Sequence, residues 1–248
     1  MSEEWLFFPC NMDGKTAFIF FDNGISDTID ETAPPLLLCA RLNFKQLADD
    51  GLPTRDEFDA LTAVEDDLQK LVDEHGAMYV GRVTVDGHRN FHVFTKEDAK
   101  AWEPRLKALG QRHGYPLSFT VEADPERKGY WKHLYPTPDD WQVIQDQQVL
   151  DVLSQHGDDG SESRLVEHWA YFPTEPEARR FCDWLKDNGY ALVAMEPDED
   201  DQISVNFSHE SAVTLPVITS HTIELRQRAS EFGGDYDGWE AIVCEEEE

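Results

Sequence analysis

The order of regular elements that the sequence predicts constrains the fold of this chain more than any other feature. In residues 164–244 a strand is followed by a helix, two strands, a second helix and a last strand. The helices are marked by apolar residues three or four positions apart, and the strands by runs rich in Val, Trp, Tyr and Phe. Thr174 and Glu177 have the spacing of a helix-capping box, and Gly189 has the residue type that ends many helices. This β-α-β-β-α-β order is typical of a ferredoxin-like unit.

The first part of the chain repeats the order. It predicts a strand at 36–43, a helix from a second capping box at Thr54 and Glu57, two strands that turn at Asp86-Gly87, a helix from Thr95, and a strand at 115–122. Two extra strands are expected near 6–8 and 17–21, and a helix at 138–153. The sequence therefore predicts an α+β chain of two tandem ferredoxin-like units, the first with extra N-terminal strands and a C-terminal helix.

A polar segment and a change in charge divide the chain. Residues 156–163 contain no apolar side chain, as is typical of a linker or long loop. Residues 1–150 hold 27 acids and 15 bases, whereas residues 151–248 hold 24 acids and 6 bases. We predict a boundary at 157–162, with domains at 1–156 and 157–248.

The net charge of −30 limits the partners of the chain. A field this negative repels phosphates, so we expect neither direct nucleic-acid binding nor binding to anionic membranes. A basic protein surface is the natural complement, although acidity also simply keeps a protein soluble. No run approaches the ~18 apolar residues that span a bilayer, and the four cysteines form no Cys-x-x-Cys pair. These features favour a cytoplasmic protein.

Motifs for catalysis are missing from the sequence. It contains no nucleophile elbow, phosphate-binding glycine loop, zinc-protease helix or dinucleotide fingerprint. The acidic runs lack the spacing of a calcium loop, and His88 and His92 flank a predicted hairpin. We therefore expect no catalytic residue, no cofactor and no metal. The alternative is an enzyme or small-ligand module of unrecognised type, with a site in the N-terminal domain, near His92 or His133, or in a cleft between the domains.

The strand at 164–172 predicts a binding surface. Alternation places Val166, His168, Ala170 and Phe172 on one face of the sheet, and Glu167, Trp169 and Tyr171 on the other. Two helices cover only one face of a four-stranded sheet, so we expect the other domain or a protein partner to cover the aromatic residues. On this fold, exposed sheet aromatics often stack bases, but the negative charge argues against that use. The residues we expect to contact a basic partner are Asp158, Asp159, Glu167, Trp169, Tyr171, Asp198, Glu199, Asp200, Asp201, Asp235 and Asp237.

Residues 155–244 resemble the ribonuclease E inhibitor B family, also called regulator of ribonuclease activity B. The resemblance is carried by Val166-Glu167-His168-Trp169-Ala170-Tyr171-Phe172 and, most specifically, by Tyr236-Asp237-Gly238-Trp239. The first 150 residues resemble domain-of-unknown-function family 695, through the strand at 36–43 and the segment 130–141. The first resemblance implies a compact ferredoxin-like domain that binds the Arg-rich, non-catalytic part of ribonuclease E and alters transcript decay. The inhibitor family often has a long acidic tail, whereas this chain ends in the short run Glu245–Glu248.

Overall fold

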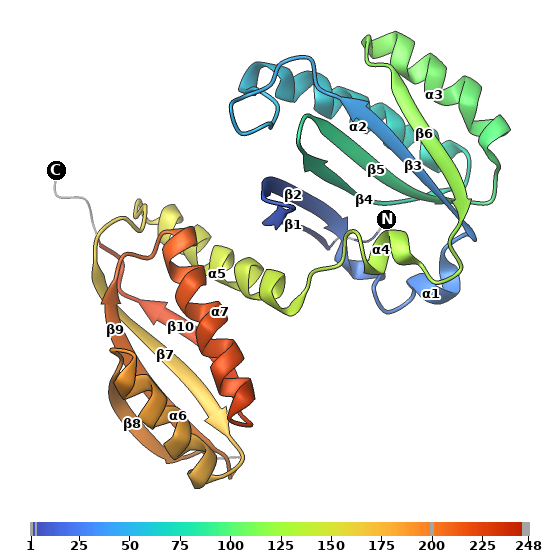
Figure 1. Ribbon diagram of the computed structural model, residues 1–248. Coiled ribbons are helices and arrows are strands. Elements are labelled where there is room, and N and C mark those ends of the chain that lie inside the picture. The colour runs from blue at the N-terminus through green and yellow to red at the C-terminus, as the bar shows by residue number, and fades with distance from the viewer. Residues whose placement is uncertain (1, 3, 199–200, 245–248) are drawn as a thin grey trace. The chain divides into compact units, whose positions relative to one another are not determined.

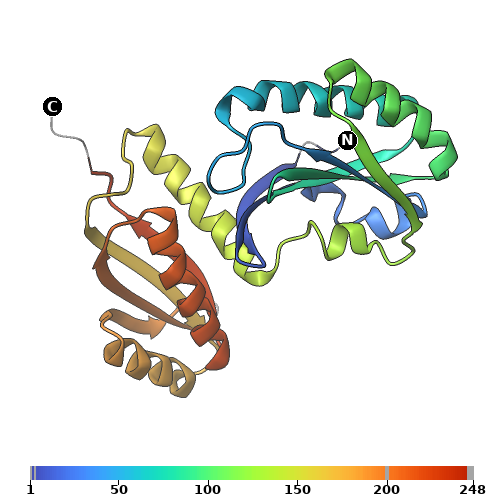
Figure 2. The ribbon, with the colours of Figure 1, turned by 45° about the horizontal axis from the view of Figure 1, so that its top comes forward.

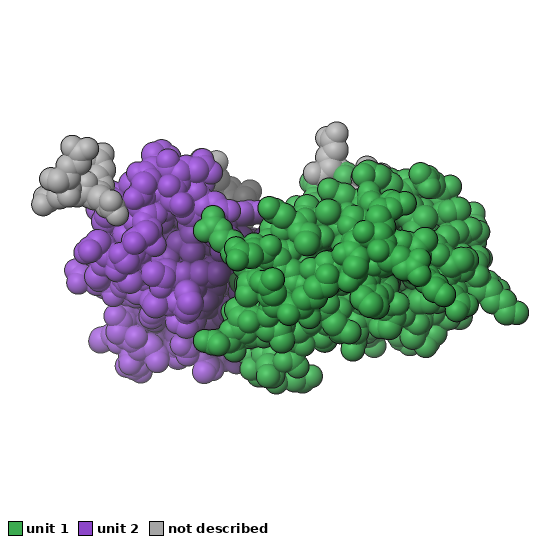
Figure 3. Space-filling view, turned by 90° about the horizontal axis from the view of Figure 1, so that it is seen from above, with its two compact units in different colours: residues 1–140 green, residues 141–248 purple. Residues whose placement is uncertain are grey.

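The computed structural model describes residues 2, 4–198 and 201–244 (Figure 1). The chain forms two compact units, Met1–Asp140 and Trp141–Glu248, which Figure 3 shows in different colours. Each unit contains one antiparallel sheet. None of the helices in these described ranges is both long and apolar enough to cross a membrane.

Six antiparallel strands form the sheet of the first unit, in the spatial order β1-β2-β4-β5-β3-β6. The last four of these have the ferredoxin-like order, in which a helix joins strands that are not neighbours. The hairpin of β1 and β2 extends the sheet beyond β4 and confirms the predicted extra strands. The strands are β1 (Trp5–Met12), β2 (Lys15–Asp22), β3 (Leu36–Asn43), β4 (Met78–Val85), β5 (His88–Thr95) and β6 (Leu117–Ala123).

Two long helices, α2 (Arg55–Glu74) and α3 (Ala99–His113), cover one face of this sheet (Figure 2). On α2 the buried residues Leu61, Val64, Leu68 and Val72 recur at helical spacing, which gives the helix one apolar side. The other face carries the short turns η1 (Asn23–Ile25), α1 (Ile29–Thr32) and α4 (Lys128–Trp131).

The second unit has the ferredoxin-like order in its simplest form. Its four antiparallel strands lie in the order β10-β7-β9-β8, with α6 and α7 packed on one face. Aromatic rings fill the core between them, as in the pair Phe172 and Phe181, whose centroids are 5.1 Å apart. The elements are β7 (Arg164–Phe172), α6 (Glu175–Asp187), β8 (Ala191–Pro197), β9 (Ile203–Ser211), α7 (Leu215–Glu231) and β10 (Asp235–Ala241).

Helix α5 (Pro138–Gln155) belongs to a different unit from the one that the sequence predicts. The sequence predicts it at the end of the first domain, whereas nearly all of it lies in the second compact unit. Leu153 packs into an apolar cluster with Val166, Val213, Ile218 and Trp239. The units therefore divide at residues 140 and 141, and the predicted linker at 157–162 lies within the second unit.

The predicted capping boxes also differ in detail. The Glu57 carboxylate accepts from the backbone N–H groups of Lys45 and Gln46, at 2.8 and 2.9 Å, and from the Tyr115 hydroxyl at 2.7 Å. The Thr174 hydroxyl donates to Glu177 at 2.7 Å and caps no backbone N–H. Glu57 therefore bonds to groups outside its own helix, and Thr174 bonds to the Glu177 side chain instead of the backbone N–H that the spacing predicts.

Candidate protein-binding face of the second unit

The face of the second sheet opposite α6 and α7, here called the open face, carries alternate residues of β7. Val166, His168, Ala170 and Phe172 are buried toward the helices, as predicted. Trp169 and Tyr171 point to the open face and are half-buried. The predicted division of β7 into two faces is therefore confirmed.

Carboxylates surround these two aromatic residues. Strand register places Glu240 opposite Glu167, and Asp235 opposite Tyr171. Like charges directly opposite each other on a sheet cost stability, so the pair of glutamates is not explained by folding alone. The acids whose register places them on the open face are Glu167 on β7, Glu196 on β8, Glu210 on β9, and Asp235 and Glu240 on β10.

All six bases of residues 151–248 lie away from the open face. Arg164 is buried at the start of β7. The other five are on the two helices: Arg179, Arg180 and Lys186 on α6, and Arg226 and Arg228 on α7. The strands of the open face therefore present acids and aromatic rings without any compensating cation, although the unit does contain bases.

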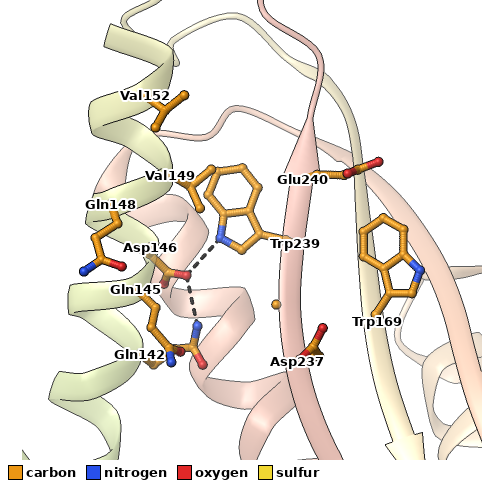
Figure 4. Close-up of a pocket in the computed structure, with 11 residues that line it drawn as sticks. Gln142, Gln145, Asp146, Gln148, Val149, Val152, Trp169, Asp237, Trp239 and Glu240 are labelled. Carbon is orange, nitrogen blue, oxygen red and sulfur yellow. Dashed lines mark hydrogen bonds between the residues drawn. The ribbon is translucent and has the colours of Figure 1, made fainter. Parts of the chain in front are cut away.

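A cavity of about 640 Å³ lies beside Trp169, between α5 and β10 (Figure 4). The register of β10 shifts between Tyr236 and Gly238, and the strand partner of Trp169 is Gly238. Because Gly238 has no side chain, β10 leaves the indole of Trp169 uncovered on that side. The other lining residues are Gln142, Gln145, Asp146, Gln148, Val149, Val152, Asp237, Trp239 and Glu240.

Asp146 fixes the helical wall of this cavity. Its carboxylate is fully buried and accepts from Gln142 Nε2 at 3.0 Å, Trp239 Nε1 at 2.9 Å and Thr222 Oγ1 at 2.6 Å (Figure 4 shows the first two). Burial raises the pKa of Asp146 because no cation replaces the lost water. Nothing in the sequence singles out Asp146 as a site residue, although it lies on the same helical face as Gln142, Val149 and Leu153.

The structure places the predicted aspartates in different environments. Asp158 is buried, and both its oxygens pair with the Arg164 guanidinium, which holds the pKa of that carboxyl well below its usual range. Both oxygens of Asp158 are therefore already paired, and Asp158 does not belong to the acids of the open face. Asp159 is exposed and accepts from the Ser161 N–H at 2.8 Å.

The acidic turn between β8 and β9 lies at the other end of β7 from Asp158. Asp198 accepts from the Gln202 N–H at 2.8 Å, and Asp201 is exposed. Glu199 and Asp200 lie outside the described residues, as do the terminal residues Glu245–Glu248. The nine residues of β7 span roughly 25 Å, so the structure does not bring the turn and Asp158 together. Asp235 and Asp237 are exposed on β10, near Tyr171 and Trp169.

Three histidines that the sequence did not point to form a cluster in which His168 is buried and His209 and His221 are half-buried. His168 is hydrogen-bonded to the Tyr236 hydroxyl at 2.8 Å and to His209 at 3.0 Å, and His221 lies 4.3 Å from His209 between ring centroids. Burial and the neighbouring histidines lower the pKa of His168 to about 2 and that of His209 to about 4. Across the described ranges, no group of three or more His, Cys, Asp or Glu side chains has the arrangement of a metal site.

His92 is one of the two histidines near which the alternative enzyme or ligand site is expected. It is buried, and its Nδ1 donates to the carbonyl of Gly129 at 2.9 Å. The nearby Asp124 carboxylate accepts from the N–H groups of Lys128 and Gly129. Burial lowers the pKa of His92 to about 4, so the ring is neutral near pH 7. The observed contacts of His92 therefore hold the α4 segment on the sheet.

The sequence and the two sheets define an α+β protein of two ferredoxin-like units. The model of a family described as "Family of unknown function (DUF695)" matches residues 3–135, and that of "Regulator of ribonuclease activity B" matches residues 143–241. The chain belongs to the DUF695 family, and its second unit carries a regulator of ribonuclease activity B domain. Both resemblances stated from the sequence are confirmed, and the second match includes most of α5.

Comparison with solved structures gives weaker similarities. One chain, titled "putative glycine cleavage system transcriptional repressor", is 9% identical with a TM-score of 0.27, over 85% of this chain and 98% of that one. Another, an unknown protein from Galdieria sulphuraria, is 13% identical with a TM-score of 0.23. The match covers 84% of this chain and 99% of that one. Scores this low do not establish a common fold. No curated protein matches the chain.

Proposed function

We propose that this protein is a non-catalytic modulator of an RNA-degrading endonuclease, and that it acts by binding basic segments of that enzyme. The observation that carries the proposal is the separation of charge in the second unit. Acids and two aromatic rings occupy the open face, and all the bases of residues 151–248 lie elsewhere. The family of this domain supplies the class of partner. The Arg-rich, non-catalytic part of ribonuclease E is the partner that the family resemblance implies.

The mechanism is competition for arginine side chains. Arg and Lys residues that otherwise hold RNA phosphates would pair with Glu167, Glu240 and Asp235, because carboxylates match the guanidinium group in charge and geometry. The uncovered indole of Trp169 offers a surface on which a guanidinium stacks. Gln142 and Gln145 border the same cavity. Their side-chain carbonyl groups would accept further N–H groups of the segment. A segment bound in this way is unavailable to RNA.

Acids outside the strands of the open face contribute differently in this proposal. Asp159 and the acids of the segment 198–201, Glu199 and Asp200 among them, would add to the field that draws a basic segment toward the unit. They carry no aromatic anchor, so their contribution is to the rate of encounter. Charge reversal at Asp198 and Asp201 should therefore weaken binding less than loss of Trp169.

Titration of the protein with a basic segment of ribonuclease E, at low and moderate salt, tests the proposal. We expect saturable, salt-dependent binding that displaces a bound RNA oligonucleotide. Trp169→Ala should weaken the affinity roughly thirtyfold, the effect of losing an interface anchor of about 2 kcal/mol. Glu240→Lys should weaken it about tenfold. Asp187→Lys is the matched control, because Asp187 is exposed on α6, on the helical side of the unit.

Three results would contradict the proposal. Binding that is indifferent to salt would exclude the electrostatic mechanism. Equal losses for Glu240→Lys and Asp187→Lys would show that only the net charge matters and not the open face. Direct binding of RNA by the protein alone would assign the aromatic residues to base stacking.

A further inference from the structure

The first unit has an uncovered aromatic surface where β1 and β2 extend the sheet beyond its helices. Phe7, Phe18 and Phe20 share one face of this hairpin, and the rings of Phe7 and Phe18 stack 5.2 Å apart. Phe58, at the start of α2, is next to them and is 53% exposed. Phe7 is 51% exposed. These rings are therefore not part of the core of the unit.

A cavity of about 510 Å³ lies over this surface. Its volume is within the range of small-molecule sites. Most of its lining is apolar, but it also includes two arginines and a threonine. The lining residues are Phe7, Phe18, Phe20, Leu52, Pro53, Phe58, Arg82, Thr84 and Arg89.

The two arginines of the cavity share one acid. Arg89 donates from Nη1 to Glu65 Oε2 at 3.0 Å, and Arg82 Nε lies 2.8 Å from the same oxygen without the alignment of a hydrogen bond. The other oxygen of Glu65 accepts from the Tyr79 hydroxyl at 2.8 Å. Among the described residues that line or touch this site, two guanidinium groups therefore face one carboxylate.

The surplus positive charge is largely buried, so water compensates it less than it would at an exposed site. The side chain of Arg89 is 4% exposed and that of Arg82 is 15% exposed. Burial and the neighbouring Arg82 lower the pKa of Arg89 to about 10, which reflects incomplete compensation of the two cations. In a chain with a net charge of −30, an apolar cavity with a surplus cation is complementary to an anion with an apolar body.

We propose that this cavity of the first unit binds an apolar monocarboxylate, with its carboxylate on the Arg82 guanidinium and its hydrocarbon or aromatic body between Phe7, Phe18 and Phe58. The carboxylate supplies the missing negative charge, and the rings supply the apolar contact. Such a group occurs in free aromatic or fatty acids and at the C-terminus of a peptide that ends in an apolar residue. The proposal concerns the first unit and is independent of the nuclease-binding role of the second.

Calorimetric titration of the full chain with 4-phenylbutyrate tests the charge requirement, because 4-phenylbutanol has nearly the same shape without the charge. We expect a Kd on the order of 0.1–1 mM for the acid, the range for a ligand of this size, and at least tenfold weaker binding of the alcohol. Acetyl-Gly-Phe and its C-terminal amide form a second pair. Tighter binding of the peptide acid would identify a peptide terminus as the source, and tighter binding of phenylbutyrate a free acid.

Variants locate the site. Arg82→Met should reduce the affinity for the acid about tenfold and leave binding of the alcohol unchanged, and Arg82→Lys should restore part of the loss. Phe58→Ala should weaken both ligands. Arg41→Met is the matched control, because Arg41 is an exposed arginine of β3 outside the cavity.

Equal binding of acid and alcohol by the unaltered protein would overturn the proposal without any variant. The proposal would also be overturned if neither acid bound. The same holds if the protein self-associated, Phe58→Ala abolished the self-association, and the acids did not inhibit it.

Discussion

Aspartates of the second unit show how far the role of a single residue depends on its surroundings. Asp158 and Asp159 are neighbours in a polar segment, and the sequence assigns both to partner binding. In the structure Asp158 is 5% exposed and pairs with Arg164, whereas Asp159 is exposed. Nothing in the local sequence distinguishes them, because Arg164 reaches Asp158 only after the chain has turned into β7. Of the acids on the open face, the sequence named two: Glu167, through strand alternation, and Asp235, beside a predicted turn.

Removal of the Asp158 carboxylate should destabilise the second unit. Asp158→Ala leaves the buried Arg164 without its partner, and breaking a buried ion pair on one side costs about 3–5 kcal/mol. Asp159→Ala, at an exposed position, should change stability by less than about 0.5 kcal/mol. Hydrogen exchange of the β7 and β9 amides, followed by mass spectrometry, would measure the free energy in this unit alone. Similar effects of the two substitutions would show that the Arg164 pair contributes little.

The histidine cluster should make the second unit sensitive to mild acid. Burial lowers the pKa values of His168 and His209 below the usual value of about 6.5, so the unfolded state takes up protons first as the pH falls. Stability is therefore fully present above about pH 6.5 and decreases toward lower pH. Each histidine contributes at most about 1.4 kcal/mol per pH unit.

Denaturation of the second unit between pH 7 and pH 5 would test this prediction. The His209→Gln variant should lose stability less steeply than the unaltered protein over this range. His156→Gln is the control, since His156 is exposed just after α5. If the free energy of unfolding fell equally steeply with pH in all three proteins, the pH dependence would come from other groups.

At the scale of elements, the sequence predicted the type and order of the strands and long helices, but not the unit to which α5 belongs. Hydrophobic spacing reports which side of a helix is buried and not what covers that side. Leu153 and Val149 of α5 pack with residues of β7, α7 and β10. The capping predictions at Thr54 and Thr174 were wrong for a related reason. Residue spacing does not show which partner a capping side chain meets. Glu57 bonds to Lys45, Gln46 and Tyr115 outside its helix, and the Thr174 hydroxyl bonds to the Glu177 side chain instead of a backbone N–H.

The assignment of α5 predicts different outcomes for two shortened chains. A chain of residues 137–248 keeps the cluster around Trp239, whereas a chain of residues 157–248 exposes it. Loss of the contacts of three apolar residues of α5 should cost about 4–5 kcal/mol, and the loss of Asp146 also leaves the Trp239 N–H without its acceptor. We expect the longer chain to unfold cooperatively in urea and the shorter chain to be largely unfolded. Equal urea midpoints for the two chains would show that α5 only connects the units and does not stabilise the second one.

For the whole molecule, the net charge was fixed by composition, but its distribution was not. The sequence showed that residues 151–248 hold six bases, and only the structure showed that none of them lies on the open face. This distribution suggests two separable contributions to binding of a basic partner. In the proposed complex, the long-range field would set the rate of encounter, and the contacts of Trp169 and Tyr171 would set the lifetime.

Association kinetics would separate these contributions. As salt rises from 20 to 200 mM, the association rate constant with a basic segment should fall by about tenfold or more, and the dissociation rate constant should change little, because screening acts on charges that approach from a distance. Trp169→Ala should do the opposite: it should raise the dissociation rate constant and leave association nearly unchanged, since the indole acts only at contact. Glu196→Lys, which reverses a charge on the open face outside the proposed contacts, should resemble added salt. If Trp169→Ala instead slowed association and left dissociation unaltered, the aromatic residues would not be anchors, and the open face would act through its charge alone.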